Sequence, residues 1–247
     1  MAQPNLPENV TRLAEGEEFH FSCHPGVSCF TDCCRDLELA LSPYDVLQLK
    51  KKLGMRSGEF LDHYVIIEQG TDDAFPHFYL TMVDDGRASC PFVTSEGCRV
   101  YESRPGACRM YPVGRGATLR DGRREDFFVL VREAHCLGFR EPVCYGCKSW
   151  MSDQGLQRYN LLNDEVMGIL QHEKIRQGMK LNQGQSAQFV LALYNLDHFR
   201  SLVLSSDFSR SYSLAAEETK KIAADEVALL RFGIRWLEKE LFGEPAL

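Results

Sequence analysis

The sequence predicts an α+β fold in which a cysteine-rich domain with short strands, residues 1–150, is followed by a helical region, residues 151–247. Three observations support this. All ten cysteines precede Trp150, and strand-like segments and turn motifs lie between them. Beyond Trp150 the hydrophobic residues recur at helical spacing. No clear linker separates the two parts, so we expect the helical region to pack on the cysteine-rich domain.

The first elements lead into and out of a cysteine segment. Phe19-His20-Phe21 alternates like a short strand that ends just before Cys23, and residues 36–41 show a second brief alternation. Ser42-Pro43-Tyr44-Asp45 is a strong helix start, with an N-cap serine, a proline at the first helical position and an acid in the first turn. Gly54 is expected to end this helix, and a second helix starts after Ser57.

The middle of the chain is expected to form strands joined by turns. Residues 77–83 are rich in strand-forming residues and are followed by the turn sequence Asp84-Asp85-Gly86. Another turn, Ser95-Glu96-Gly97, precedes Cys98, and residues 125–132 predict a buried strand. The later sequence predicts three helices, over residues 163–177, 186–204 and 219–242.

Composition and charge narrow the functional classes. The formal net charge of -7 argues against a mainly electrostatic grip on nucleic acid or on an anionic membrane. Residues 1–8 lack the charged and apolar regions of a signal peptide, and the apolar runs are too short to span a bilayer. We therefore expect a soluble, cytoplasmic protein without a nucleic-acid or membrane partner.

The cysteines are the strongest functional signal. The first four follow the spacing C-x5-C-x3-C-C, and adjacent Cys33 and Cys34 are poorly placed to form a disulfide with each other. Without a secretory signal, metal binding or redox chemistry is favoured over a disulfide framework or over thiols that act as small hydrophobes. The candidate metal ligands are Cys23, Cys29, Cys33, Cys34, Cys90, Cys98, Cys108, Cys136, Cys144 and Cys147.

Thiolates select zinc, copper(I) or iron–sulfur clusters over hard cations. Because a tetrahedral site uses four donors, eight cysteines would fill two sites and leave two over. Cys33 and Cys34 point in different directions in most backbone conformations and can therefore serve two centres, or one of them can be a ligand alone. Cys144-x2-Cys147 also suits a zinc knuckle. The spacing leaves iron and zinc both open.

Other residues near the cysteines have two interpretations. His20, His24 and His135 are either metal ligands or supporting donors, or they are ordinary half-buried histidines. Arg104 and Arg109 flank Cys108 and are expected to support a thiolate cluster rather than to bind substrate. The sequence contains no Ser-His-acid hydrolase motif, phosphate-binding loop, dinucleotide loop or H-E-x-x-H motif.

After Cys33-Cys34, the segments Ser89-Cys90-Pro91-Phe92, Cys98 to Pro105 and Cys108 to Pro112 resemble the YkgJ-like CxxCxxCC family. The resemblance covers about residues 20–147 and implies a zinc- or iron-chelating domain. The first gaps here are five and three residues, where the family name implies two and two. Cys23 is therefore a less secure ligand than the cysteines that match best by position, which are Cys29, Cys33, Cys34, Cys90, Cys98 and Cys108.

The same pattern is similar to that of flagellin lysine N-methylases, and this likeness implies an iron–sulfur cluster and S-adenosylmethionine. The sequence has no C-x3-C-x2-C triplet of radical enzymes. Three hypotheses remain: a protein that holds iron, as an iron–sulfur cluster, or zinc; a cluster-dependent lysine N-methylase-like enzyme; and a structural zinc module for a protein partner. The sequence leaves open whether the chain is an enzyme.

Overall fold

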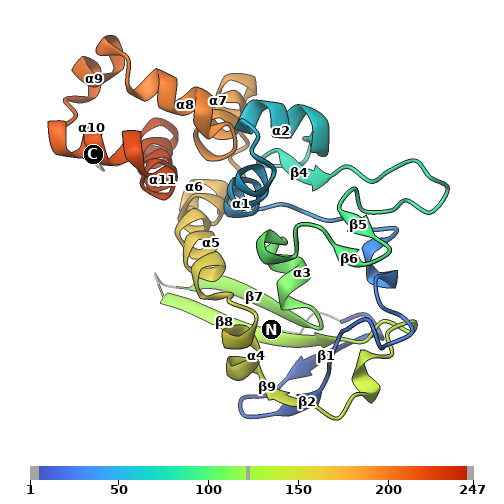
Figure 1. The fold of residues 1–247 in the computed structure, drawn as a ribbon. Coiled ribbons are helices and arrows are strands. Elements are labelled where there is room, and N and C mark those ends of the chain that lie inside the picture. Colours follow the sequence, from blue (N-terminus) through green and yellow to red (C-terminus); the bar gives the residue numbers. More distant parts are fainter. Residues whose placement is uncertain (1–5, 121–122, 244–247) are drawn as a thin grey trace. The chain divides into compact units, whose positions relative to one another are not determined.

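The computed structural model describes residues 6–120 and 123–243, and it folds as two compact units (Figure 1). The cysteine unit comprises Met1–Leu39 and Met82–Asn160, and the helical unit comprises Ala40–Thr81 and Leu161–Leu247. Helices and small antiparallel sheets together confirm the α+β class. The predicted boundary at residue 150, between a cysteine-rich domain and a helical region, remains a prediction. The chain ranges of the units interleave because residues 40–81 leave the cysteine unit and join the helical one.

The largest sheet of the cysteine unit has three antiparallel strands in the order β1 (Val10–Leu13), β8 (Arg123–Val131), β7 (Val113–Arg120). β8 confirms the strand expected over residues 125–132, but the expectation that it is buried is wrong. Leu130 is its only buried side chain, and Phe127 remains 38% exposed. The charged residues at the start of β8 lie in an exposed two-stranded ribbon with β7, where apolar burial is limited.

A short strand pair leads to the cysteines. β2 (Glu18–His20) pairs with β9 (Cys144–Gly146), one residue earlier than the predicted strand. Phe21 follows β2 and makes edge-on contacts with Tyr111, Phe139 and Trp150 at centroid distances of 5.8, 5.2 and 5.5 Å. These rings form the core beside the cysteine segments.

The remaining elements of the cysteine unit are short. The hairpin β5 (Val93–Thr94) and β6 (Gly97–Cys98) confirms the predicted turn before Cys98. Residues 36–41 are not a strand. Isolated bridges form instead, between Arg35, just before this stretch, and Ser89, and between Ala40, within it, and Tyr79. The other short helices are η1 (Asp32–Cys34), η2 (Tyr101–Ser103), α3 (Gly106–Met110), η3 (Gly138–Arg140) and α4 (Cys147–Asp153).

The helical unit begins with α1 (Pro43–Leu53), as predicted. The Ser42 hydroxyl accepts a hydrogen bond from the Asp45 backbone N–H, and the Asp45 carboxylate accepts one from the Ser42 backbone N–H. Gly54 ends the helix at a φ of 66°, which glycine adopts without strain. α2 (Ser57–Tyr64) follows, and then β3 (Val65–Glu68) pairs with β4 (His77–Leu80), which is shorter than the predicted strand over 77–83.

The later helices are more broken than predicted, because polar residues interrupt each expected helix. His172 and Asp225 cap new helices by accepting backbone N–H groups, and the third break lies at Asn195. α9 (Ser206–Tyr212) has no counterpart among the predictions. The other helices are α5 (Gln157–Leu170), α6 (Glu173–Arg176), α7 (Gln183–Leu193), α8 (Leu196–Val203), α10 (Ala216–Ala224) and α11 (Glu226–Phe242).

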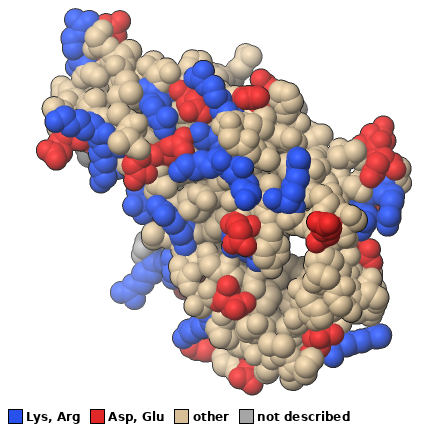
Figure 2. Space-filling view, viewed as in Figure 1, with Lys and Arg blue, Asp and Glu red and all other residues tan. Residues whose placement is uncertain are grey.

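Close helix contacts and one buried ion cluster hold the helical unit together. A Cβ at Gly233 of α11 would lie 2.4 Å from the Ala192 carbonyl oxygen of α7, so the glycine permits close approach. Lys50, whose side chain is 6% exposed, lies 3.0 Å from Asp197 and 2.5 Å from Glu226. On the surface, basic and acidic side chains are interspersed over the helices (Figure 2). Within residues 6–120 and 123–243, no helix is long and apolar enough to cross a membrane.

Candidate metal centre

Four thiols meet around one small cavity of the cysteine unit. Cys23, Cys29, Cys33 and Cys136 line this cavity of about 30 Å³, together with other residues that include Tyr111 and His135. The backbone N–H of Ser22 donates to the Gly138 carbonyl over 3.1 Å and so brings the segment before Cys23 beside the one after Cys136. We call the four cysteines the first thiol group.

Two neighbours of the first thiol group are suited to support thiolates. The Leu137 backbone N–H donates to the Cys29 sulfur at 3.1 Å, a bond that becomes stronger when the sulfur carries charge. The Tyr111 hydroxyl is buried and has no hydrogen-bond partner of standard geometry among the described residues. Burial, followed by the neighbouring Cys136 thiol, raises the pKa of Tyr111, so this phenol keeps its proton and can donate a hydrogen bond.

A second set of thiols adjoins the first. The Cys34 carbonyl accepts the Cys90 backbone N–H at 2.8 Å, and the β5–β6 hairpin returns the chain to Cys98. Cys90 and Cys108 raise the pKa of the Cys34 thiol, after the larger effects of Cys33 and burial. Cys98 likewise raises the pKa of Cys90, after the larger effect of burial. We call Cys34, Cys90, Cys98 and Cys108 the second thiol group.

The two groups meet at Cys33 and Cys34 within the turn η1. A hydrogen bond between the two thiols lowers the pKa of Cys33 to about 7 and raises the pKa of Cys34 well above its ordinary value. One proton is thus readily lost from this pair, whereas a second negative charge is strongly opposed.

Desolvation favours the protonated form of three further thiols, Cys23, Cys90 and Cys98. Burial raises the pKa of Cys23 to about 11, with further contributions from Cys33, Cys29 and Cys136. Burial also raises the pKa of Cys90 and of Cys98. A soft metal cation would reverse this balance, because it binds thiolates and displaces their protons.

The donor set fits zinc or an iron–sulfur cluster in kind and in number, since eight soft sulfur donors make two sets of four. The present side-chain geometry is not that of a closed site. Among the described residues, no three Cys, His, Asp or Glu side chains converge closely enough to hold a metal ion. Ligation therefore requires thiol side chains to rotate toward a shared centre.

Cys144 and Cys147 are placed differently from the other candidates. Cys144 lies in β9 with its sulfur 3.6 Å from the Glu18 carboxylate, and Cys147 begins α4. Partial desolvation and then Glu18 raise the pKa of Cys144, and burial raises that of Cys147. Neither cysteine is among the described residues that line the cavity of the first thiol group.

The three candidate histidines also differ. His24 is engaged at both ring nitrogens, 3.1 Å from the Gly26 backbone N–H and 3.3 Å from the Glu141 carboxylate. His20 lies 3.2 Å from the Pro142 carbonyl through Nδ1. His135 lines the cavity of the first thiol group and is the histidine best placed to support a metal there.

The sequence did not indicate the Leu137 N–H as part of the site, because every non-proline residue carries a backbone N–H. Only the folded structure directs this one toward the Cys29 sulfur. Tyr111 is near Cys108 in sequence, but the structure places it at the cavity of the first thiol group.

Residues 22–137 match the family model CxxCxxCC, described as a putative zinc- or iron-chelating domain. We call this matched stretch, residues 22–137, the CxxCxxCC segment. The match confirms the resemblance predicted from the sequence. The CxxCxxCC segment contains all eight cysteines of the two thiol groups and ends before Cys144 and Cys147. Searches of curated proteins and of solved structures found no match to the chain.

Proposed function

We propose that the CxxCxxCC segment binds iron, as an iron–sulfur cluster, or zinc through its two thiol groups. The observation that carries this proposal is the meeting of four thiols from two separate chain segments around one cavity. A family match that contains these four cysteines and the other four of the second group supports it independently. Such a non-local arrangement of soft donors has a clear chemical use in metal binding.

The residues would have different roles in metal binding. The first thiol group would hold one centre and the second thiol group another, with Cys33 and Cys34 contributing to different centres. Bound zinc would cross-link the cysteine unit, whereas a bound iron–sulfur cluster would supply one-electron chemistry. The Leu137 N–H would donate to the Cys29 thiolate and the Tyr111 hydroxyl to the Cys136 thiolate, and both would disperse negative charge.

Purification of the full chain without oxygen, followed by metal analysis and a visible spectrum, tests the proposal. We expect either brown protein containing iron and sulfide, or colourless protein with stoichiometric zinc. Colourless protein that contains zinc would refute the iron–sulfur form. Protein that retains no metal and takes up neither zinc nor iron on reconstitution would refute metal binding itself.

An enzymatic role is the second candidate, and its support is the motif similarity to flagellin lysine N-methylases. In that case the metal-loaded protein would also bind S-adenosylmethionine. Titration calorimetry of the loaded protein with this compound tests the idea, and an absence of binding heat at several temperatures would refute it. Ten free cysteines are consistent with action in a reducing compartment such as the cytoplasm, which we include in the proposal.

A further inference from the structure

The strand β3 of the helical unit has one paired edge and one open edge. On the paired side, the Thr81 backbone N–H donates to the Tyr64 carbonyl at 2.8 Å. Bonded pairs alternate along an antiparallel ladder, so the N–H and carbonyl of Ile67, three residues after Tyr64, point away from β4. Among the described residues, neither of these two groups has a hydrogen-bond partner on that outer side. They are available to pair with a further strand.

The far side of β4 supports the same orientation. Phe78 is the register partner of Ile67, and its carbonyl accepts the Leu41 backbone N–H at 2.8 Å. That carbonyl therefore points away from β3. Ala40 also forms a bridge with Tyr79 on this side. β4 thus has a neighbour on each side, and β3 is the strand with an uncovered edge.

Two large apolar side chains are exposed on this edge strand. Ile66 is 49% exposed and Ile67 is 42% exposed. Successive side chains of a strand point to opposite faces, so each face of β3 offers one isoleucine to solvent. An extended chain that added to β3 would cover both isoleucines with its own alternate side chains.

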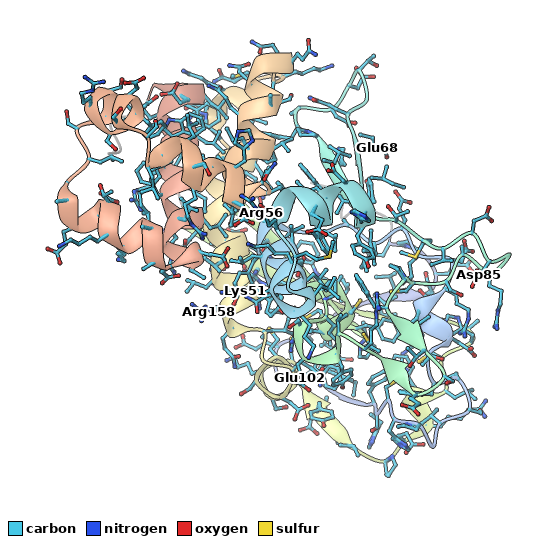
Figure 3. The ribbon with its side chains drawn as sticks, turned by 45° about the horizontal axis from the view of Figure 1, so that its top comes forward. Lys51, Arg56, Glu68, Asp85, Glu102 and Arg158 are labelled. Carbon is cyan, nitrogen blue, oxygen red and sulfur yellow. The ribbon has the colours of Figure 1, made fainter. Side chains whose placement is uncertain are left out.

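Acidic side chains flank β3 at both ends. Asp62 lies in α2 just before the strand, and Glu68, labelled in Figure 3, is the last residue of the strand. Both are exposed, and neither forms an ion pair within the described part of the chain. Lys180, beside the loop that follows β3, already pairs with Asp72 at 3.0 Å. The charge at this edge therefore favours a segment with lysine or arginine at its ends.

A second copy of the chain fits this edge less well. It would bring the same acids, so like charges would gather where the two strands meet. A charged side chain on an edge strand is also a common protection against pairing between copies. β3 has only four residues, and two such strands cover much less than the roughly 1,600 Å² of a typical stable interface.

We propose that the open edge of β3 binds an extended segment of a partner protein, in which alternate apolar residues are flanked by lysine or arginine. The segment adds as a further strand and exchanges backbone hydrogen bonds with Ile67. Its apolar side chains cover Ile66 and Ile67, and its basic ends face Asp62 and Glu68. No cysteine lies in α2 or β3, so this inference does not rest on the proposed metal binding.

The probe is the fluorescein-labelled peptide KKVTVTVKK, and its binding to the reduced full chain is measured by fluorescence anisotropy at low and at physiological salt. Two matched peptides accompany it. One is EEVTVTVEE, and the other is the basic peptide methylated at its central backbone nitrogens, which removes the hydrogen-bond donors. We expect the basic peptide to bind about 10-fold more tightly than the acidic one at low salt, with a smaller difference at higher salt. The methylated peptide should not bind, because strand addition depends on backbone hydrogen bonds.

Substitutions in β3 test the edge itself. Ile67→Pro removes the outward N–H without removing a bond to β4, and an edge strand tolerates proline at such a position. It should weaken binding of the basic peptide by about 3–10-fold. Ile67→Val, the matched control, keeps the N–H and should bind like wild type. Glu68→Lys should remove most of the preference for the basic peptide over the acidic one.

Four results would overturn the inference. These are binding of the methylated peptide as tight as that of the basic peptide, unchanged affinity in folded I67P, an unchanged charge preference in E68K, and no binding of any peptide to wild type. If I67P does not fold, the methylated peptide and E68K still decide the outcome. A wild-type dimer in sedimentation equilibrium that I67P or E68K disrupts would instead assign this edge to a second copy of the chain.

Discussion

If the two thiol groups are separate sets of four donors, as we propose, replacing single cysteines should remove metal in discrete steps. Zinc-reconstituted wild type should hold about two zinc ions per chain, one for each set. Structural zinc sites bind with about 10–16 kcal/mol, so each of four thiolates accounts for about 3 kcal/mol. Removal of one thiolate should therefore weaken its site by more than about 100-fold.

The assay is zinc content after equilibration with a chelator whose affinity lies between those of intact and three-thiolate sites. Cys136→Ser in the first thiol group and Cys98→Ser in the second should each retain about one zinc ion per chain. The double variant should retain none, whereas Cys144→Ser, as the matched control, should retain the wild-type amount. If C136S or C98S alone loses all zinc, the eight thiols form one shared centre. A loss in C144S would show that the β9 cysteine is a ligand.

Three further predictions concern backbone packing and charge. Gly138→Ala places a Cβ about 2.7 Å from the Ser22 carbonyl oxygen, so we expect metal loss from the first thiol group with the second retained, measured by the same zinc assay. Gly233→Ala presses on the Ala192 carbonyl and should lower the free energy of unfolding by about 1–3 kcal/mol or more in urea titrations. Burial would raise the pKa of Asp197, but hydrogen bonds and a neighbouring ammonium outweigh it and lower the pKa to about 2. Its stabilisation, about 2 kcal/mol, is thus complete above the unfolded pKa near 4 and is lost as pH falls toward 2; Asp197→Asn should abolish that part of the acid dependence.

Local sequence signals predicted part of the fold well. The helix from Pro43 to Leu53 was predictable because its start and its end are both encoded by nearby residues, Ser42 with Asp45 and then Gly54. The breaks at Asn195 and Asp225 were not predicted, because hydrophobic spacing continues across them and only capping contacts reveal the interruption. The exposure of Phe127 depends on what covers the sheet, which local sequence does not encode.

The candidate site shows the same limit. Cysteine counting and spacing indicated thiolate chemistry, but they could not show which thiols share a cavity. Cys136 lies far from Cys23 in the chain and joins it only through folding around Phe21 and Gly138. Conversely, the spacing of Cys144 and Cys147 is typical of a zinc knuckle, yet neither lines the cavity of the first thiol group.

The chain order around the second thiol group gives metal a topological role. After Cys34 the chain leaves the cysteine unit, forms α1, α2, β3 and β4 of the helical unit, and returns just before Cys90. The backbone bond from Cys90 to Cys34 and the Arg35–Ser89 bridge already close the base of this excursion. A metal ligated by both cysteines would cross-link the two ends of this segment. By analogy with a disulfide that closes a loop of this length, this cross-link would lower the entropy of the unfolded chain. The folded state would thereby be stabilised by about 4 kcal/mol. Metal loss would therefore lower the free energy of unfolding as well as emptying the site.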